Sequence, residues 1–232
     1  MRAMPSRPRV ICHMVPSVDG RIVVSGWKLG PALTRAYERT GASFAADAWM
    51  IGRVSMAPYA GRSRIPRRPR GAPAIPRTDF IARKDAPSYA IALDPAGKLT
   101  WRSSSIDEDH VVTVLTERVS DDTLAFLRAR GVSYVFGGKA RVDLARVLRK
   151  LRAAFGIRTL LLEGGGAING SFLAADLIDE LSVIVAPVVD GATGTPTLFD
   201  VRPERGPRRA LKLLAVEKLP SDLLWVRYRV KR

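Results

Sequence analysis

Short, mostly apolar runs recur along the chain, and most are separated by segments whose apolar positions repeat at helical spacing. A short apolar run between turn residues is typical of a strand that is buried on both faces. On this pattern we predict strands at 10–15, 48–51, 89–93, 111–115, 132–136, 157–162 and 181–185.

Capping residues mark the ends of the predicted helices. Ser120 precedes two aspartates and predicts the start of a helix that ends at Gly131. Asp143 likewise predicts the start of an amphipathic helix that ends at Gly156, because glycine readily adopts the left-handed conformation that closes a helix. Two further helices are predicted, at 31–44 with Pro31 in the first turn, and at 167–175.

The alternation of strands and helices predicts a parallel sheet with helices on both faces. The last two apolar segments, 211–216 and 223–230, follow one another without a helix, which predicts an antiparallel pair. The expected fold class is therefore α/β, with three layers and a mostly parallel central sheet that has antiparallel C-terminal edge strands. We expect a single domain over 1–232, with 1–8 as a flexible tail and 61–87 as a basic insertion.

The net charge of +16 and the isoelectric point near 10.9 predict an anionic partner. Nucleic acid, an acidic membrane surface and a phosphorylated small molecule all fit the charge alone. Much of the excess lies in 62–84, where eight basic residues face a lone Asp79. Phe80 is the one aromatic residue there, so no stacking platform for bases accompanies the charge. We interpret the segment as a solvated loop and expect neither a nucleic-acid nor a membrane partner.

Cysteine and histidine are too scarce for a disulfide framework or a metal site. Cys12 is the only cysteine, and His13 and His110 have no metal-ligand spacing, so we expect no bound metal. Cys12 lies within a predicted strand and is interpreted as a buried small side chain rather than a nucleophile. The chain has no long uncharged apolar run and no signal-peptide pattern at its start, which predicts a cytoplasmic protein.

A glycine-rich turn is the strongest local signal for a binding site. Gly164, Gly165 and Gly166 connect a buried strand to a helix, where the backbone can approach a ligand closely and free N–H groups attract phosphate. The same glycines are equally compatible with a tight turn that binds nothing. Glu163 ends the strand, where a carboxylate either binds a ligand or caps neighbouring backbone; we favour the ligand.

Two earlier strand ends have a similar character. The stretch Ser17-Val18-Asp19-Gly20-Arg21-Ile22 follows the first strand, and Ile51-Gly52-Arg53 ends the second with an arginine suited to phosphate. Asp19 and Gly20 are also common in simple turns. Because ligands of α/β sheets bind at the carboxyl ends of strands, the three strand ends together predict one crevice.

These stretches, with Asp47-Ala48, Asp179-Glu180-Leu181 and Ala186-Pro187-Val188, resemble the pyrimidine-reductase family of riboflavin biosynthesis. That family is the reductase half of a bifunctional deaminase-reductase and has the dihydrofolate-reductase-like fold. The resemblance runs from about residue 8 to about residue 230. It implies an NADPH-dependent oxidoreductase that forms a homodimer and reduces 5-amino-6-(5-phosphoribosylamino)uracil or a related compound.

The resemblance also implies roles for individual residues. Glu163 and Asp19 are the expected catalytic residues that orient the substrate, and Ser17 joins them in binding it. The residues expected to bind NADPH are Val15, Trp27, Gly52, Arg53, Ser55, Thr116, Arg118, Gly164, Gly165, Gly166, Ala167, Ile168 and Asn169. Of these, Val15 and Trp27 would flank the nicotinamide, and Arg53 or Arg118 would contact the 2′-phosphate.

The chain departs from the family pattern in one stretch. Ser55 stands in place of the family's threonine, and 56–60 replaces its acidic stretch, so the substrate can differ from the riboflavin intermediate. A single cysteine also cannot supply the zinc ligands of the deaminase half. A reductase of pterins or dihydrofolate is the alternative within enzymes, and a basic nucleic-acid-binding protein is the alternative outside them.

Overall fold

The computed structural model describes residues 6–201 and 207–231. Contacts between residues divide the chain into two compact units. Of the described residues, unit 1 contains 6–8 and 47–158, and unit 2 contains 9–46, 159–201 and 207–231. Unit 2 is thus built from two separate segments, and the larger segment of unit 1 lies between them in the sequence.

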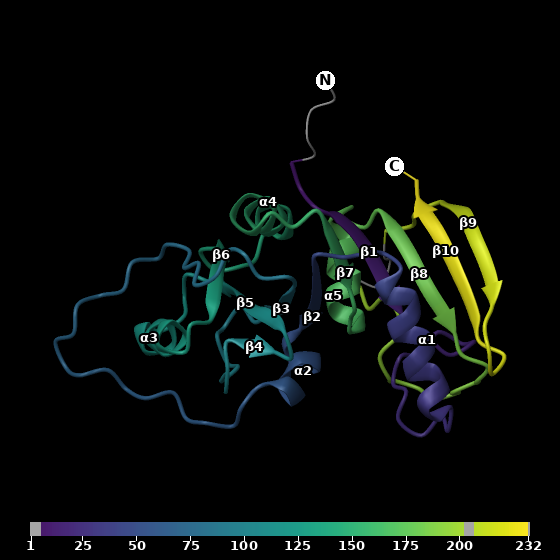
Figure 1. Cartoon of the computed structure of the whole chain (residues 1–232), viewed down its shortest axis with the longest axis horizontal. Helices are drawn as coiled ribbons and strands as arrows, with labels where there is room; N and C mark the ends of the chain where they lie inside the picture. The colour runs from purple at the N-terminus through teal and green to yellow at the C-terminus, as the bar shows by residue number, and fades with distance from the viewer. Residues whose placement is uncertain (1–5, 202–206, 232) are drawn as a thin grey trace. The chain divides into compact units, whose positions relative to one another are not determined.

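Unit 1 has a parallel sheet that follows the predicted apolar runs (Figure 1). Its parallel strands lie in the order β2 (Ala48–Gly52), β3 (Tyr89–Leu93), β5 (Asp109–Thr116) and β6 (Ser133–Gly138). The two-residue strand β4 (Ser105–Ile106) pairs antiparallel with the start of β5. Parallel pairing brings the carboxyl ends of β2, β3 and β5 to one edge of this sheet.

Two helices cover the sheet of unit 1 on opposite faces (Figure 1). Helix α3 (Asp121–Ala129) packs Leu124 and Leu127 into the same cluster as Leu115. Helix α4 (Leu144–Phe155) sets Phe155 edge-on to Tyr89, at 5.1 Å between ring centroids. Along a strand, successive side chains point to opposite faces of the sheet. The sheet residues that contact α3 therefore lie on one face, and those that contact α4 lie on the other.

The predicted caps of both helices are confirmed. The hydroxyl of Ser120 accepts a hydrogen bond from the amide of Thr123, and the carboxylate of Asp143 accepts one from the amide of Arg146. Gly156 closes α4 with φ +73°, in the left-handed region that glycine adopts without strain. Two short elements follow β2 that the pattern did not predict, α2 (Arg53–Met56) and the 3₁₀ helix η1 (Ala57–Tyr59).

The basic segment 61–87 has no helix or strand of length, yet it is tied to unit 1 at several points. The Asp121 side chain at the start of α3 pairs with Arg68 and Arg77 and accepts the amide of Ile75. Further along, Asp79 pairs with Lys150 at 2.8 Å. The interpretation as a merely solvated loop was therefore incomplete, because the acidic first turn of α3 fixes its path.

Unit 2 has a mixed sheet (Figure 1). Its strands lie in the order β7 (Thr159–Leu162), β1 (Arg9–Met14), β8 (Glu180–Val185), β10 (Leu224–Val230) and β9 (Leu211–Lys218). The first three are parallel and the last two antiparallel. Helix α1 (Gly30–Ala42) covers the face that carries His13, whose ring stacks on Tyr37 at 4.5 Å. Helix α5 (Gly166–Ala174) follows β7.

The predicted fold class is confirmed: an α/β architecture with mostly parallel strands and antiparallel C-terminal strands. Cys12 is 1% exposed, and its burial raises the pKa of the thiol far above its ordinary value, as its interpretation as a core residue requires. None of the helices in the described ranges is long and apolar enough to cross a bilayer.

Candidate active site

An apolar cavity of about 270 Å³ lies in unit 2 beside the end of β7. Its lining residues are Met14, Val15, Ile22, Val24, Leu33, Thr34, Tyr37 and Glu163. The cavity thus contains the predicted substrate residue Glu163 and the predicted nicotinamide neighbour Val15. Glu163 is the one ionisable carboxylate in this lining, so a polar ligand here would be oriented mainly by that side chain.

Glu163 is half-buried and directly follows β7. Its negative charge is the second cause, after burial, of the raised pKa of Cys12 on the neighbouring strand β1. A carboxylate held in such an apolar setting is a strong acceptor for N–H donors that enter the cavity. Position and surroundings therefore agree with a ligand role for Glu163.

Packing within unit 2 explains two of the three turn glycines. Gly164 has φ +92°, and a Cβ there would meet the Met14 side chain at 2.7 Å. A Cβ on Gly166 would lie 2.3 Å from both the Thr197 carbonyl oxygen and an Asp200 carboxylate oxygen. The loop that contains Thr197 and Asp200 thus packs onto the turn, so these glycines have a structural reason of their own. Gly165, the N-cap residue of α5, is partly exposed.

Asn169, one turn into α5, has an unsatisfied acceptor. Its side chain is fully buried, and its Nδ2 donates to the carbonyl of Leu198 at 3.0 Å. Its Oδ1 has no hydrogen-bond partner among the described residues. A buried acceptor without a donor costs free energy, and a donor from a bound group would remove that cost. Of the other predicted residues here, Ala167 is exposed and Ile168 is buried.

Ser17 and Asp19 form a network that ties two loops of unit 2 together. The Ser17 hydroxyl donates to Asp19 at 2.6 Å, and the amides of Asp190 and Gly191 each donate to the same carboxylate at 2.9 Å. These hydrogen bonds, led by that of Ser17, lower the pKa of Asp19 well below its ordinary value. Asp19 is therefore an anion with internal partners, and it holds no proton to give at neutral pH.

Trp27, the second predicted nicotinamide neighbour, does not line the cavity. Its indole N–H donates to Asp190 at 2.9 Å, and its ring packs on a core cluster that includes Ala186 and Leu219. Val15 belongs to the same cluster and also to the cavity lining. The structure therefore brings Val15, but not Trp27, to Glu163.

Unit 1 contains the other predicted cofactor residues, at the carboxyl edge of its sheet. Gly52 ends β2, and Arg53 and Ser55 are exposed on α2. Thr116 ends β5, but its hydroxyl donates to the Pro95 carbonyl at 2.8 Å, which leaves it only as an acceptor. Arg118 is exposed in the turn that follows β5.

Asp94 was not predicted as a site residue, although it directly follows β3 between these strand ends. Its side chain is fully buried, with one oxygen accepting the Leu99 amide at 2.7 Å and the other without a partner. Burial raises the pKa of Asp94, and hydrogen bonds and the charge of Arg53 partly oppose that rise. In the sequence, its position at a strand end indicated a possible site residue. The nearby Pro95 and Gly97 led us to interpret the stretch as an ordinary turn.

A cavity with one carboxylate thus lies at a strand end, beside a glycine turn on a mostly parallel sheet. The model of the RibD C-terminal domain family matches residues 8–225. The chain belongs to this family. The family is one of reductases, which implies a nicotinamide cofactor.

Curated relatives agree with this assignment. A 2,5-diamino-6-ribosylamino-4(3H)-pyrimidinone 5′-phosphate reductase of Methanothermobacter thermautotrophicus is 36% identical over 127 residues, which are 54% of this chain and 57% of the relative. A reductase of the same name from Aquifex aeolicus is 32% identical over 39% of this chain and 40% of its own. The matched regions thus span about half the length of these curated relatives.

The fold is shared with a pyrimidine reductase-like protein of Corynebacterium diphtheriae, with a TM-score of 0.72 and 18% identity over 99% of this chain and 96% of that one. It is also shared with a riboflavin biosynthesis reductase of Saccharomyces cerevisiae, with a TM-score of 0.62 and 15% identity over 100% and 93% of the two chains. At such identities the likeness concerns the fold alone.

Proposed function

We propose that this chain is an NADPH-dependent reductase of riboflavin biosynthesis. Its substrate would be a ribosylaminopyrimidine phosphate, either 2,5-diamino-6-ribosylamino-4(3H)-pyrimidinone 5′-phosphate or 5-amino-6-(5-phosphoribosylamino)uracil. The single observation that carries the proposal is the apolar cavity in which Glu163 is the one carboxylate. An aminopyrimidine ring offers a flat body for such a cavity and N–H donors for such a carboxylate.

The residues of the cavity suit hydride transfer by position and exclusion of water. When bound, NADPH would supply a hydride to the ribosylamino carbon in its ring-opened imine form, and the imine nitrogen would take a proton from solvent. Glu163 accepts hydrogen bonds from the pyrimidine edge and fixes its orientation, while apolar neighbours such as Met14 and Leu33 exclude water. Ionised Asp19 accepts hydrogen bonds from Ser17 and from the loop at Asp190. Asp19 and Ser17 stay predicted contacts of the substrate.

The residues proposed to hold NADPH show several features that fit it. In unit 2, Gly165 is partly exposed at the start of α5, and Asn169 has a buried acceptor without a partner. In unit 1, Arg53 and Arg118 are exposed guanidinium groups, suited to the 2′-phosphate that distinguishes NADPH from NADH. We further propose that the chain functions as one domain, because it passes between the two units three times, and that it forms a homodimer.

The decisive experiment measures loss of NADPH absorbance with both ribosylaminopyrimidine phosphates, dihydrofolate and a simple aldehyde as acceptors. We expect turnover with a pyrimidine and none with the aldehyde. In Glu163→Gln, kcat/KM for the pyrimidine should fall by about tenfold or more, while NADPH affinity should stay within about twofold, because a hydrogen bond to a charged group contributes about 1.5 to 3 kcal/mol. Glu108→Gln, at an exposed glutamate of unit 1, is the matched control.

Other outcomes would redirect the assignment. Turnover confined to dihydrofolate would favour a pterin reductase, and an unchanged rate in Glu163→Gln would remove the role given to that residue. A salt-sensitive complex with random duplex DNA, together with no NADPH binding, would favour the nucleic-acid alternative.

A further inference from the structure

A second cavity lies in unit 1 between the basic segment and helix α3, and it shares no residue with the proposed active site. Its volume is about 370 Å³, within the range of small-molecule sites. Its lining residues are Ser63, Arg64, Pro66, Arg67, Arg68, Pro69, Asp122, Ala125, Phe126, Ala129 and Arg130. The family resemblance assigns no role to it.

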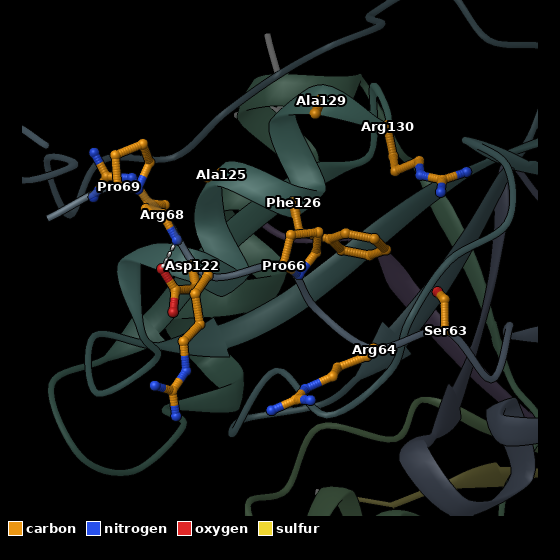
Figure 2. Close-up of a pocket in the computed structure, with 11 residues that line it drawn as sticks. Ser63, Arg64, Pro66, Arg68, Pro69, Asp122, Ala125, Phe126, Ala129 and Arg130 are labelled. Atoms are coloured by element: carbon orange, nitrogen blue, oxygen red, sulfur yellow. Dashed lines mark hydrogen bonds between the residues drawn. The ribbon is translucent and has the colours of Figure 1, made fainter.

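The floor of this cavity is apolar. Figure 2 shows the Phe126 ring beside Pro66, with Ala125 and Ala129 on the adjoining turns of α3. Phe126 is 7% exposed, so little of its ring is open for stacking. A ligand body that lies here would bury apolar surface against α3.

The rim is strongly cationic, with four arginines against one aspartate. Two of the arginines are already engaged: Arg68 pairs with Asp121 at 3.1 Å, and Arg130 donates to the Arg102 carbonyl and covers Phe126. Within the described residues, Arg64 and Arg67 have neither an ion pair nor a hydrogen bond. These guanidinium groups are therefore available to an anionic ligand.

The backbone around the cavity is held in place before any ligand binds. The Arg68 amide donates to Asp122 at 2.9 Å, the dashed contact of Figure 2, so the lone aspartate is committed to the loop. Asp121 fixes the next part of the segment through Arg77 and the Ile75 amide. A preorganised loop loses less entropy on binding than a free one.

We infer that this cavity binds a small organic anion, a molecule with a phosphate or carboxylate group on an apolar body. The anionic group would accept hydrogen bonds from Arg64 and Arg67, and the body would lie on Phe126 and Ala129. The volume of about 370 Å³ and the absence of an exposed aromatic ring in this lining favour a small molecule over a nucleic-acid strand.

The test uses the full chain labelled with ¹⁵N and follows the amide signals of Ala125 and Ala129 during titration. Phenyl phosphate and benzoate are the probes, and they separate the two kinds of anionic group. Inorganic phosphate and phenol, which each lack one half of the proposed chemistry, are the comparisons. At least one probe should bind saturably, and about tenfold more tightly than either comparison, because ring burial and a charge-assisted hydrogen bond are each of that order.

Variants locate the site. The double variant Arg64→Gln/Arg67→Gln should weaken probe binding by about tenfold or more. The matched control Arg62→Gln/Arg70→Gln removes two arginines of the same segment that do not line the cavity, and it should bind as the wild type does. Ala129→Glu, which places an anion at the exposed end of the floor, should also weaken binding. Amide spectra of each variant report whether it has folded.

Three results would overturn the inference: equal affinity in the double variant, signal changes confined to residues outside this cavity, or inorganic phosphate binding as tightly as both probes. A single-stranded oligonucleotide that shifts the α3 signals while neither probe does so would assign the face to nucleic acid instead. The readout is independent of NADPH turnover, so its failure leaves the proposed reductase function untouched.

Discussion

Two carboxylates that look alike in the sequence behave differently in their surroundings. Asp19 and Glu163 both follow strands of unit 2, and both were predicted to orient the substrate. Asp19 accepts hydrogen bonds from Ser17 and from two backbone amides, whereas Glu163 lines an apolar cavity. Position alone could predict both as candidates. Only the partners, which come from the distant loop at Asp190, show that Asp19 also has a structural role.

The lowered pKa of Asp19 predicts a pH dependence of stability. A depressed folded-state pKa contributes stability above the unfolded-state pKa of about 3.9, and this contribution is lost as the pH falls below it. The melting temperature of the wild type should therefore exceed that of Asp19→Asn at pH 7, and the gap should narrow as the pH falls from about 5 to about 3. Asp107→Asn, at an exposed turn, is the control, and a gap that stays constant with pH would contradict the prediction.

The glycine turn supports a prediction that separates packing from binding. Gly166→Ala should lower the free energy of unfolding by about 1 to 3 kcal/mol, because its Cβ would overlap Thr197 and Asp200. Gly165→Val should instead leave the fold largely intact and abolish NADPH binding, since a branched side chain blocks close approach at this turn. Thermal melting and fluorescence titration measure the two effects. A Gly165→Val variant that melts early but binds NADPH when folded would make the whole turn structural.

At the level of helices and strands, long elements with clear caps could be predicted and short or irregular ones could not. The apolar run 89–93 became β3, and Ser120 and Asp143 cap the helices they were expected to cap. The elements α2 and β4 were not predicted, because four and two residues are too few to show a repeating pattern of apolar positions. The path of 61–87 could not be predicted for another reason. Its path is fixed by ion pairs of its own Arg68, Arg77 and Asp79 with Asp121 and Lys150, which are tertiary contacts without a local pattern.

Two arginines at the carboxyl edge of unit 1 are the candidates for selecting NADPH over NADH. Arg53 starts α2 and Arg118 follows β5, so each presents a guanidinium beside a strand end. Loss of the arginine that contacts the 2′-phosphate should weaken NADPH binding by about tenfold or more and leave NADH binding unchanged. Calorimetry of Arg53→Ala and Arg118→Ala, with Arg149→Ala on the exposed face of α4 as control, measures it. Equal affinity of the wild type for both cofactors would contradict the assignment.

For the whole molecule, the sequence predicted the family-wide features and missed the organisation into units. The resemblance rested on stretches from Ser17 to Val188, and the family match over 8–225 confirms it. The division between unit 1 and unit 2 has no marker at residues 46–47 or 158–159, because the chain crosses there within ordinary loops. The net charge of +16 predicted an anionic partner. NADPH and a phosphorylated substrate are both anionic, and the proposed assays test whether they bind.

The exposed edge of unit 2 carries the last prediction, which is homodimerisation. Strand β9 pairs with β10 on one side, and within the described residues no strand pairs with its other side. Leu213 and Val216 on β9 are 52% and 53% exposed. Apolar side chains on an open edge strand favour association with another chain.

We therefore expect light scattering at micromolar concentration to give twice the chain mass of 25.4 kDa. The double variant Leu213→Lys/Val216→Lys should shift the mass to that of one chain, because each lysine would bury a charge in the contact. Val54→Lys, which changes an even more exposed valine of unit 1, should leave the dimer intact. A monomeric wild type would refute the dimer itself, whereas a dimer that persists in the double variant would move the contact away from β9.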